Sequence, residues 1–477
     1  MKRIVIGVDG TWQSALHQQH PADLSNISRL LTAVDSLDNR QSPPVPQIKL
    51  YIPGVGTGEE VAAGAFHGAI GEGVLEKVRE AYLFLAQNWD EGDEITLFGF
   101  SRGAYVVRLL CTLIHLLGIL DRKTNLSLFP TIFDALCTNW NPHNGGEEGA
   151  RRLEPLLELI KAHKLAQVQK AEGGFLVKMV GLFDTVPLYH FRHLEPTSST
   201  VQPPAHYSPF GLPDSPLEPH IETALHALAL DEMRDAYEPL LWRVGPDGLR
   251  KGQTLQQTWF AGIHTDVGGG YSLHDLADLS LAWLASHLIP KLSLDLSYLS
   301  ALSAHPSAPW GEMQPRTRAH LFKGHRRRPL AYSFDGSKTF ESLHSSILHQ
   351  DPANLPSSLA SMLQHPTSAA IVPLLEWERR VKEEWPLKDA DAADDTASTT
   401  SSDSPASRMA TSTTSPFLPT ARLDLPAVAV VASPAGEPLE KKKMLSKQEV
   451  LALLDGLKEV HEKLRAAGDA PGLSKAR

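Results

Sequence analysis

The stretch "EITLFGFSRGAYVVRLL" (residues 94–110) decides the fold, because it joins a strand to a helix through a serine flanked by glycines. Residues 95–98 are apolar or β-branched, as in a buried strand, and residues 104–110 are almost wholly apolar, as in a helix packed on a sheet. Between them, residues 99–103 match the pattern G-x-S-x-G, in which the serine occupies a tight strand-to-helix turn with its hydroxyl exposed. We therefore predict that Ser101 is a nucleophile; the alternative is a serine that only caps the helix.

Further apolar runs, each ending in glycine or a small polar residue, recur along the chain at 2–10, 47–56, 93–101, 175–186 and 257–267. Stretches with helical spacing lie between and after them, at 73–89, 103–120 and 273–289. This alternation predicts an α/β protein with a largely parallel sheet flanked by helices. In such sheets the loops at the carboxyl ends of the strands carry the functional site.

We expect residues 1–386 to form this α/β domain. A cap insertion is expected at about 187–256, where a Pro- and His-rich segment is followed by a helical pattern at 221–237. The mixed pattern after the last of these strands predicts a helical extension at about 273–386.

The composition changes abruptly after the domain. Residues 387–440 are rich in Ala, Ser, Thr, Asp and Pro, which predicts a disordered linker because such a segment buries too little apolar surface to fold. Residues 441–477 contain an amphipathic helix with a capping box at Ser446 and Glu449. We expect this helix either to dock back onto its own domain or to bind a partner, with docking slightly favoured.

A serine nucleophile needs a base to take its proton and an acid to orient that base. In α/β-hydrolases the chain order is serine, then acid, then histidine. Asp184 ends the apolar run "LVKMVGLFD" and His264 ends "TWFAGIH", so both leave strands on the expected side and in the expected order. We predict Asp184 as the acid and His264 as the base, with Asp231 and Asp266 as alternative acids.

An oxyanion also needs backbone donors. The N–H of Arg102, which follows the nucleophile, is one candidate, and the loop "VDGTW" (8–12) supplies a second through Gly10 or Thr11. The same loop superficially matches the D-x-D-G-T motif of haloacid-dehalogenase-type phosphatases. Gly7 stands where that motif has its nucleophilic aspartate, which excludes that chemistry.

The glycine-rich segments do not indicate a cofactor. Residues 53–60 ("PGVGTGEE") lack the G-K-[ST] of a phosphate-binding loop and are interpreted as a loop at the rim of the site. Residues 268–270, three glycines, permit a loop that folds back over the serine. His264 and Asp266 are two residues apart, which is no zinc spacing, so we predict neither a metal nor a cofactor.

The composition argues against several classes of protein. The net charge is −10, which argues against nucleic-acid binding, and the basic runs 325–328 and 441–443 are interpreted as solvated surface. Two cysteines exclude a disulfide framework, and the N-terminus resembles a strand more than a signal peptide, so we expect a cytoplasmic protein. The longest apolar segment, 104–120, contains Arg108 and His115 and is too short for a transmembrane span, which still allows peripheral membrane contact.

Six sequence blocks, taken together, carry a family resemblance. They are "VDGTW", "YIPGVGTG", "LFGFSRGAY", "VGLFDTV", "ALALDEMRDAYEP" and "WFAGIHTDVGGGY". Over roughly residues 1–290 the chain resembles the α/β-hydrolase family long catalogued as a domain of unknown function, whose bacterial members include type VI secretion phospholipase effectors. The resemblance implies an α/β-hydrolase fold with a triad of Ser101, Asp184 and His264, and in some members phospholipase A activity.

The sequence therefore predicts a serine hydrolase that cleaves an ester through an acyl-enzyme. A lipid or phospholipid ester is the expected substrate by resemblance alone. The alternative hypothesis is a hydrolase-like binding or scaffolding module whose C-terminal helix binds a partner.

Overall fold

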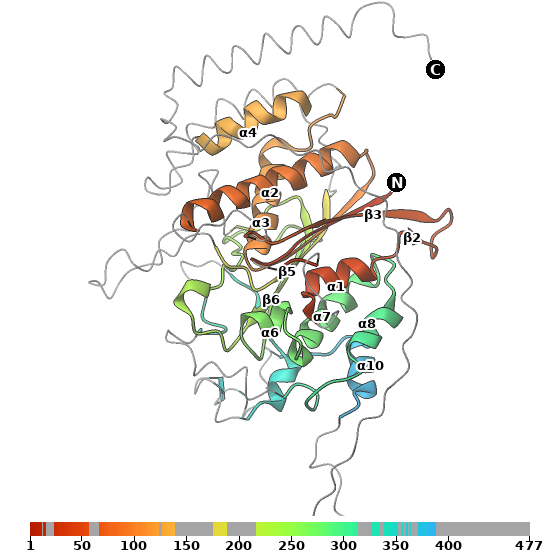
Figure 1. Cartoon of the computed structure of the whole chain (residues 1–477), viewed down its shortest axis with the longest axis vertical. Coiled ribbons are helices and arrows are strands. Elements are labelled where there is room, and N and C mark those ends of the chain that lie inside the picture. Colours follow the sequence, from red (N-terminus) through yellow and green to blue (C-terminus); the bar gives the residue numbers. More distant parts are fainter. Residues whose placement is uncertain are drawn as a thin grey trace, which may run out of the picture. The chain divides into compact units, whose positions relative to one another are not determined.

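The computed structural model contains one sheet whose strands run in the order β2-β3-β1-β4-β5-β6-β7-β8-β9 (Figure 1). Neighbouring strands are parallel throughout, except for the antiparallel pair β2 and β3 at one edge. The strands are β1 (Arg3–Val8), β2 (Leu37–Asp38), β3 (Val45–Ile52), β4 (Glu94–Phe100), β5 (Val177–Phe183), β6 (Ile221–Ala229), β7 (Thr254–Phe260), β8 (Glu341–His344) and β9 (Ile371–Val372). The predicted fold class, a largely parallel sheet flanked by helices, is confirmed.

The structure describes residues 1–11, 13–15, 23–56, 66–123, 126–138, 175–187, 216–312, 327–332, 338–351, 355, 359–360, 363 and 371–387. These residues belong to one compact unit. Its helices include α1 (Asn26–Ala33), α2 (Phe66–Asn88), α3 (Arg102–Leu117), α4 (Phe129–Thr138), α6 (His264–Gly268), α7 (Asp275–Leu288), α8 (Leu296–Leu302) and α10 (Glu376–Glu384), with short 3-10 helices η2 (Leu126–Leu128), η4 (Asp235–Tyr237) and η7 (Ser345–His349). The expected linker and C-terminal helix lie outside the described residues.

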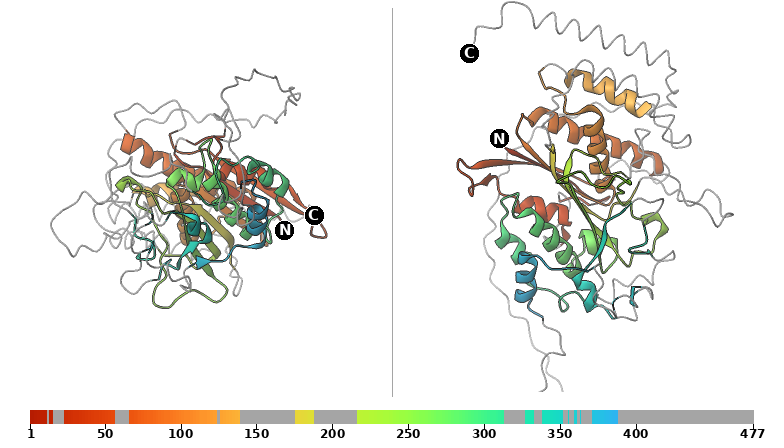
Figure 2. Two further views of the ribbon diagram at one scale, coloured as in Figure 1. Left: turned by 90° about the horizontal axis from the view of Figure 1, so that it is seen from below. Right: turned by 180° about the vertical axis from the view of Figure 1, so that it is seen from behind.

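Helices cover both faces of the sheet. α2 and α3 lie on one face with α4 beyond them, and α1, α7, α8 and α10 lie on the other, an arrangement that Figure 1 and the right-hand view of Figure 2 show. Each face has its own apolar core: Val78, Tyr82 and Leu110 belong to the first, and Phe98 and Trp283 to the second. Because apolar helices shield both faces, the central strands are apolar on both sides; all six residues of β1 are buried.

The chain winds in opposite directions from β1, since β3 lies on one side of it and β4 on the other. From the carboxyl ends of β1 and β4 the chain continues to helices on opposite faces of the sheet, α1 and α3, which is the arrangement of a topological switch point. The loops after these two strands contain residues 9–11 and Ser101, which places both at the switch point of the sheet.

The prediction of a helix at 221–237 was wrong for its main part. Residues 221–229 form β6, which pairs with β5 on one side and β7 on the other. Alanine and leucine favour helices, but pairing on both sides and near-complete burial outweigh this weak propensity. The region expected to be a cap thus contributes a central strand, and its part at 188–215 lies outside the described residues.

The helical extension at 273–386 was only partly correct. α7, α8 and α10 are helical, but β8 and β9 add two parallel strands beyond β7. With four residues and two, these strands are too short to produce a readable alternation. Among the helices of the described ranges, none is both long and apolar enough to cross a bilayer.

Candidate active site

Ser101 occupies the turn between β4 and α3 with φ of 58° and ψ of −124°, a left-handed conformation that is strained for any residue but glycine. The flanking glycines are needed because the turn is so tight. A Cβ on Gly103 would lie 2.3 Å from the carbonyl oxygen of Asp9, and one on Gly99 would lie 2.5 Å from the Cα of Ala104. The two glycines therefore let β1, β4 and α3 approach closely beneath the serine.

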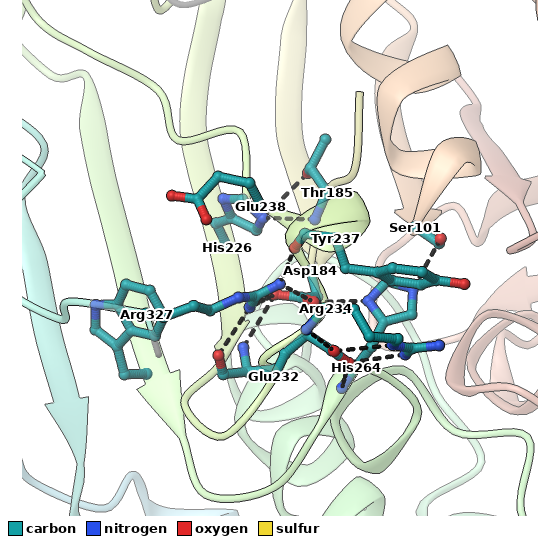
Figure 3. Close-up of polar contacts among 12 residues, drawn as sticks. Ser101, Asp184, Thr185, His226, Glu232, Arg234, Tyr237, Glu238, His264 and Arg327 are labelled. Atoms are coloured by element: carbon teal, nitrogen blue, oxygen red, sulfur yellow. Dashed lines mark hydrogen bonds and ion pairs between the residues drawn. The ribbon is translucent and has the colours of Figure 1, made fainter. Parts of the chain in front are cut away.

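His264 lies against Ser101 (Figure 3). Its Nε2 is 2.8 Å from the Oγ of Ser101, and its Nδ1 is 2.6 Å from Oδ2 of Asp184. The strand ends earlier than predicted, at Phe260, and His264 is instead the first residue of the short helix α6. Because Asp184 accepts a hydrogen bond from Nδ1–H, Nε2 is left free to accept the hydroxyl proton of the serine.

Aromatic rings enclose the imidazole. The ring of Phe100 lies 4.7 Å from that of His264, centroid to centroid, and the Tyr237 ring meets it edge-on at 4.8 Å. Burial lowers the pKa of His264, while its hydrogen bond to Asp184 opposes that effect. The neutral imidazole, which can act as a base, is therefore the dominant form at pH 7.

The glycine run after His264 has a packing role. A Cβ on Gly268 would lie 1.9 Å from the Phe100 ring, so this position admits no side chain. Gly269 and Gly270 follow with φ of 80° and 109°, values that glycine adopts without strain. The glycine run thus lets α6 pack directly against Phe100, the residue before the serine, which is consistent with the expected return of this loop over the nucleophile.

Asp184 follows β5 and is completely buried, with φ of 41°. Besides His264, it accepts hydrogen bonds from the backbone N–H of Ala229 at 3.0 Å and from the guanidinium of Arg327. Burial alone would raise the pKa of Asp184, but the charge of Arg327 and the hydrogen bond from His264 hold it below its usual value. The group is a carboxylate at neutral pH.

Arg327 is the residue that sequence reasoning missed. It belongs to the basic run interpreted as solvated surface, yet only 3% of it is exposed. Its two terminal nitrogens lie 2.6 and 3.0 Å from the two carboxylate oxygens of Asp184. The interpretation was wrong for Arg327, whereas the next residue, Arg328, is exposed. The partner is 143 residues away in the chain, so no local pattern signals the pair.

The alternative acids lie elsewhere. Asp266 accepts a hydrogen bond from the N–H of Ile263 at 2.9 Å, within its own helix start, and Asp231 accepts one from Gly262 at 2.8 Å. Burial raises the pKa of Asp266 to about 7. Neither carboxylate hydrogen-bonds His264 among the bonds that the described residues form.

The loop after β1 lies beside the nucleophile turn, as expected for the oxyanion site. The side chain of Arg102 reaches the hydroxyl of Thr11 at 3.4 Å. The N–H of Gly10 donates to the carboxylate of Asp9 at 2.8 Å, so of the two donors considered in this loop it is the one already engaged. Arg102 is the first residue of α3, where backbone N–H groups have no partner within the helix.

A second polar layer supports these residues. Glu232 accepts a hydrogen bond from the N–H of His264 at 3.3 Å and binds Arg234 through both carboxylate oxygens. The guanidinium of Arg234 stacks on the Tyr237 ring at 3.6 Å. This layer fixes the start of α6 and the ring beside the imidazole (Figure 3).

His226 supports the turn that carries Asp184. Its Nε2 accepts a hydrogen bond from the N–H of Thr185 at 3.0 Å, and its Nδ1 lies 3.2 Å from Oε1 of Gln257. Burial lowers the pKa of His226 to about 3, so the ring stays neutral. It therefore acts as a hydrogen-bonding support for the turn that carries Asp184. Within the described residues, no group of three or more His, Cys, Asp and Glu side chains could hold a metal ion.

A largely parallel sheet with a serine in the tight turn after a central strand, a histidine against it and a buried aspartate behind the histidine defines the α/β-hydrolase class. Comparison with known proteins narrows this class. The sequence model described as "T6SS, Phospholipase effector Tle1-like, catalytic domain" matches residues 2–287, and the chain belongs to that family. The matched residues include Ser101, Asp184 and His264.

Two further similarities are more limited. An uncharacterized protein of Saccharomyces cerevisiae, YEL023C, is 28% identical over 134 residues, which are 25% of this chain and 18% of that protein. A crystal structure of an uncharacterized protein from Pseudomonas aeruginosa is 16% identical with a TM-score of 0.29, covering 66% of this chain and 48% of the other. The chain thus matches less than half of each of these proteins.

Proposed function

We propose that this chain is a serine hydrolase that cleaves a lipid ester through an acyl-enzyme. One observation carries the proposal: the hydrogen-bonded series from Ser101 through His264 to Asp184, with distances of 2.8 and 2.6 Å, at the tight turn after β4, where Ser101 is buried rather than exposed as the motif predicted. Membership of a phospholipase effector family supports the lipid ester as substrate.

In the first half-reaction, Nε2 of His264 removes the proton of the Ser101 hydroxyl while the Oγ attacks the ester carbonyl. The imidazolium that forms is stabilised by the carboxylate of Asp184. The N–H groups of Arg102 and Thr11 are the proposed donors to the oxyanion, and Gly10 is replaced in this role because Asp9 engages its N–H. Collapse of the tetrahedral intermediate expels the alcohol, which takes the proton from His264.

In the second half-reaction, His264 removes a proton from water, which attacks the acyl group on Ser101. The resulting intermediate releases the fatty acid, and His264 returns the proton to the serine oxygen. All atoms balance as ester plus water giving acid plus alcohol, with no cofactor required.

The proposal is tested by labelling the folded protein with a fluorophosphonate probe. We expect one adduct, on Ser101, that is absent after Ser101→Ala and after heat denaturation. Ser297→Ala, which changes an exposed serine on α8, is the matched control and should label like the unchanged chain. Absence of an adduct on Ser101 in folded protein would rule out the nucleophile.

The substrate class is tested with phosphatidylcholine and phosphatidylethanolamine vesicles, together with short- and long-chain p-nitrophenyl esters, by measuring fatty acid or nitrophenol release. Hydrolysis that disappears in Ser101→Ala supports an esterase, and fatty acid release from vesicles supports a phospholipase. A protein that labels nowhere and hydrolyses nothing would instead fit the alternative of a hydrolase-like binding module.

A further inference from the structure

Arg327 is not one of the three predicted triad residues, but its guanidinium hydrogen-bonds Asp184 and two backbone carbonyls of the site. Its side chain is 1% exposed and that of Asp184 is 0% exposed, so the ion pair is shielded from water. One terminal nitrogen also donates to the carbonyl of Ala229 at 2.7 Å, and the other donates to the carbonyl of Tyr237. The guanidinium thus joins three segments of the site.

The segment that carries Arg327 lies beyond the residues that match the catalytic-domain family, which end at 287. It is fastened to the sheet by Glu341 of β8, whose carboxylate accepts hydrogen bonds from the N–H groups of Leu330 at 2.8 Å and Tyr332 at 3.2 Å. The hydroxyl of Tyr332 also donates to Glu238 at 3.1 Å. The last part of the sheet therefore holds the arginine in place.

Asp184 lies between Arg327 and His264 (Figure 3). The fork of a guanidinium matches the two oxygens of a carboxylate, so such a pair sets orientation as well as charge. Here it aims the remaining lone pair of Oδ2 at Nδ1 of His264, which lies 2.6 Å away.

The protonation state of His264 depends on the charged groups around its imidazole. The charged groups that face it are Asp184, Glu232 and Arg327, and Glu232 is already paired with Arg234. Among the described residues, Arg327 and His264 supply the charges that lower the pKa of the buried Asp184, so loss of Arg327 would leave a protonated His264 as its counter-charge. A protonated His264 cannot accept the serine proton.

We propose that Arg327 is a positioning residue of this active site, which orients the carboxylate of Asp184 and balances its charge so that His264 stays neutral and able to act as the base. This proposal rests on the triad mechanism proposed above. It assigns a role in the site to a segment that the family match does not include.

The test compares Arg327→Gln and Arg327→Lys with the exposed neighbour Arg328→Gln as the matched control. For Arg327→Gln we expect kcat to fall by about 10²-fold with KM nearly unchanged, a loss of the size seen for misoriented catalytic groups. The acidic limb of the pH–kcat/KM profile should move up by about one pH unit, because loss of a nearby positive charge raises the pKa of His264. Arg328→Gln should match the unchanged chain in all three quantities.

Arg327→Lys separates geometry from charge and serves if the glutamine variant does not fold. It keeps the charge but not the fork, so kcat should fall at least about tenfold while the acidic limb stays in place. A fully active lysine variant would overturn the orienting role. A folded glutamine variant whose limb does not move would overturn the charge-balancing role.

A readout without turnover distinguishes this proposal from the proposed function. In Ser101→Ala protein, NMR titration of labelled imidazole carbons, with the His264 signal assigned by its loss in His264→Gln, reports the pKa of His264 directly. We expect that pKa to be higher when Arg327→Gln is added. An unchanged titration refutes the charge-balancing role of Arg327, whereas a chain inactive on every ester refutes the proposed function and leaves the titration interpretable.

Discussion

Asp266 should be a carboxyl group that costs the protein stability at neutral pH. It is 3% exposed, its pKa is raised by burial from the usual 3.8 to about 7, and Asp231 and Glu232 add to the increase. In the folded chain it holds a proton up to about pH 7, whereas in the unfolded chain it ionises near pH 4. The folded state is therefore penalised increasingly as the pH rises from about 4 to 7, and by a constant amount above that.

The size of the penalty follows from the difference of about three units between the pKa of Asp266 in the folded chain and in the unfolded chain. This difference corresponds to about 4 kcal/mol at pH 8. Asp266→Asn removes the ionisation, and the asparagine oxygen still accepts the hydrogen bond from Ile263. We expect the free energy of unfolding to rise relative to the unchanged chain by an amount that grows by about 3 kcal/mol between pH 5 and pH 8.

The assay is urea unfolding followed by tryptophan fluorescence at several pH values, with esterase activity measured on the same samples. Asp266→Asn should keep most of the activity, because Asp184 and not Asp266 contacts His264. A stability difference that is the same at pH 5 and pH 8, or a variant that becomes less stable as the pH rises, would refute the reasoning. Loss of activity in a folded Asp266→Asn protein would instead indicate that Asp266 is the acid of the triad.

Four other outcomes are expected. Asp184→Asn should lower kcat by about 10⁴-fold and also destabilise the fold by about 3–5 kcal/mol, because it leaves the buried guanidinium of Arg327 without its carboxylate; ester hydrolysis and urea titration measure the two effects. The acidic limb of kcat/KM in the unchanged chain should lie below about pH 6.5, because burial lowers the pKa of His264 and the neutral form is the base; a limb above pH 7 contradicts this. Gly103→Ala should destabilise the fold by about 3 kcal/mol or more, since its Cβ would meet two backbone carbonyls at 2.3 and 2.4 Å; a calorimetric melt checks this. Arg29→Ala should cost about 3–5 kcal/mol by leaving the buried carboxylate of Asp278, 2.8 Å away, without its cation, and an unchanged urea midpoint would argue otherwise.

Much of the sheet could be predicted because most central strands are buried on both faces and therefore appear as continuous apolar runs. β6 was missed because its alanines and leucines suit a helix equally well, and only its two neighbouring strands decide the matter. β8 and β9 are too short to carry a pattern. Their existence depends on β7 offering an edge, which is a property of the folded sheet.

The residues of the candidate site, like the strands, were predicted only in part from the sequence. Ser101, Asp184 and His264 could be proposed because each follows an apolar run, and parallel strands bring their carboxyl ends to one edge. The structure places His264 within hydrogen-bonding distance of both Ser101 and Asp184. Arg327 could not be proposed, because a basic run is usually solvated. The burial of Arg327 depends on contacts with residues that are far from it in the sequence.

The left-handed backbone at Ser101 and Asp184 has a practical consequence for engineering. Such conformations cost about 1–3 kcal/mol for residues with a side chain, which exceeds the roughly 1 kcal/mol that glycine loses through its freedom in the unfolded chain. Glycine at position 101 would therefore be tolerated or favoured in a screen for expression and heat resistance, whereas glycine at position 184 would leave the buried guanidinium of Arg327 without its carboxylate and cost about 3–5 kcal/mol. A library selected on those traits alone would therefore accumulate stable but inactive proteins that lack the serine, so position 101 must be held constant in any stabilisation campaign.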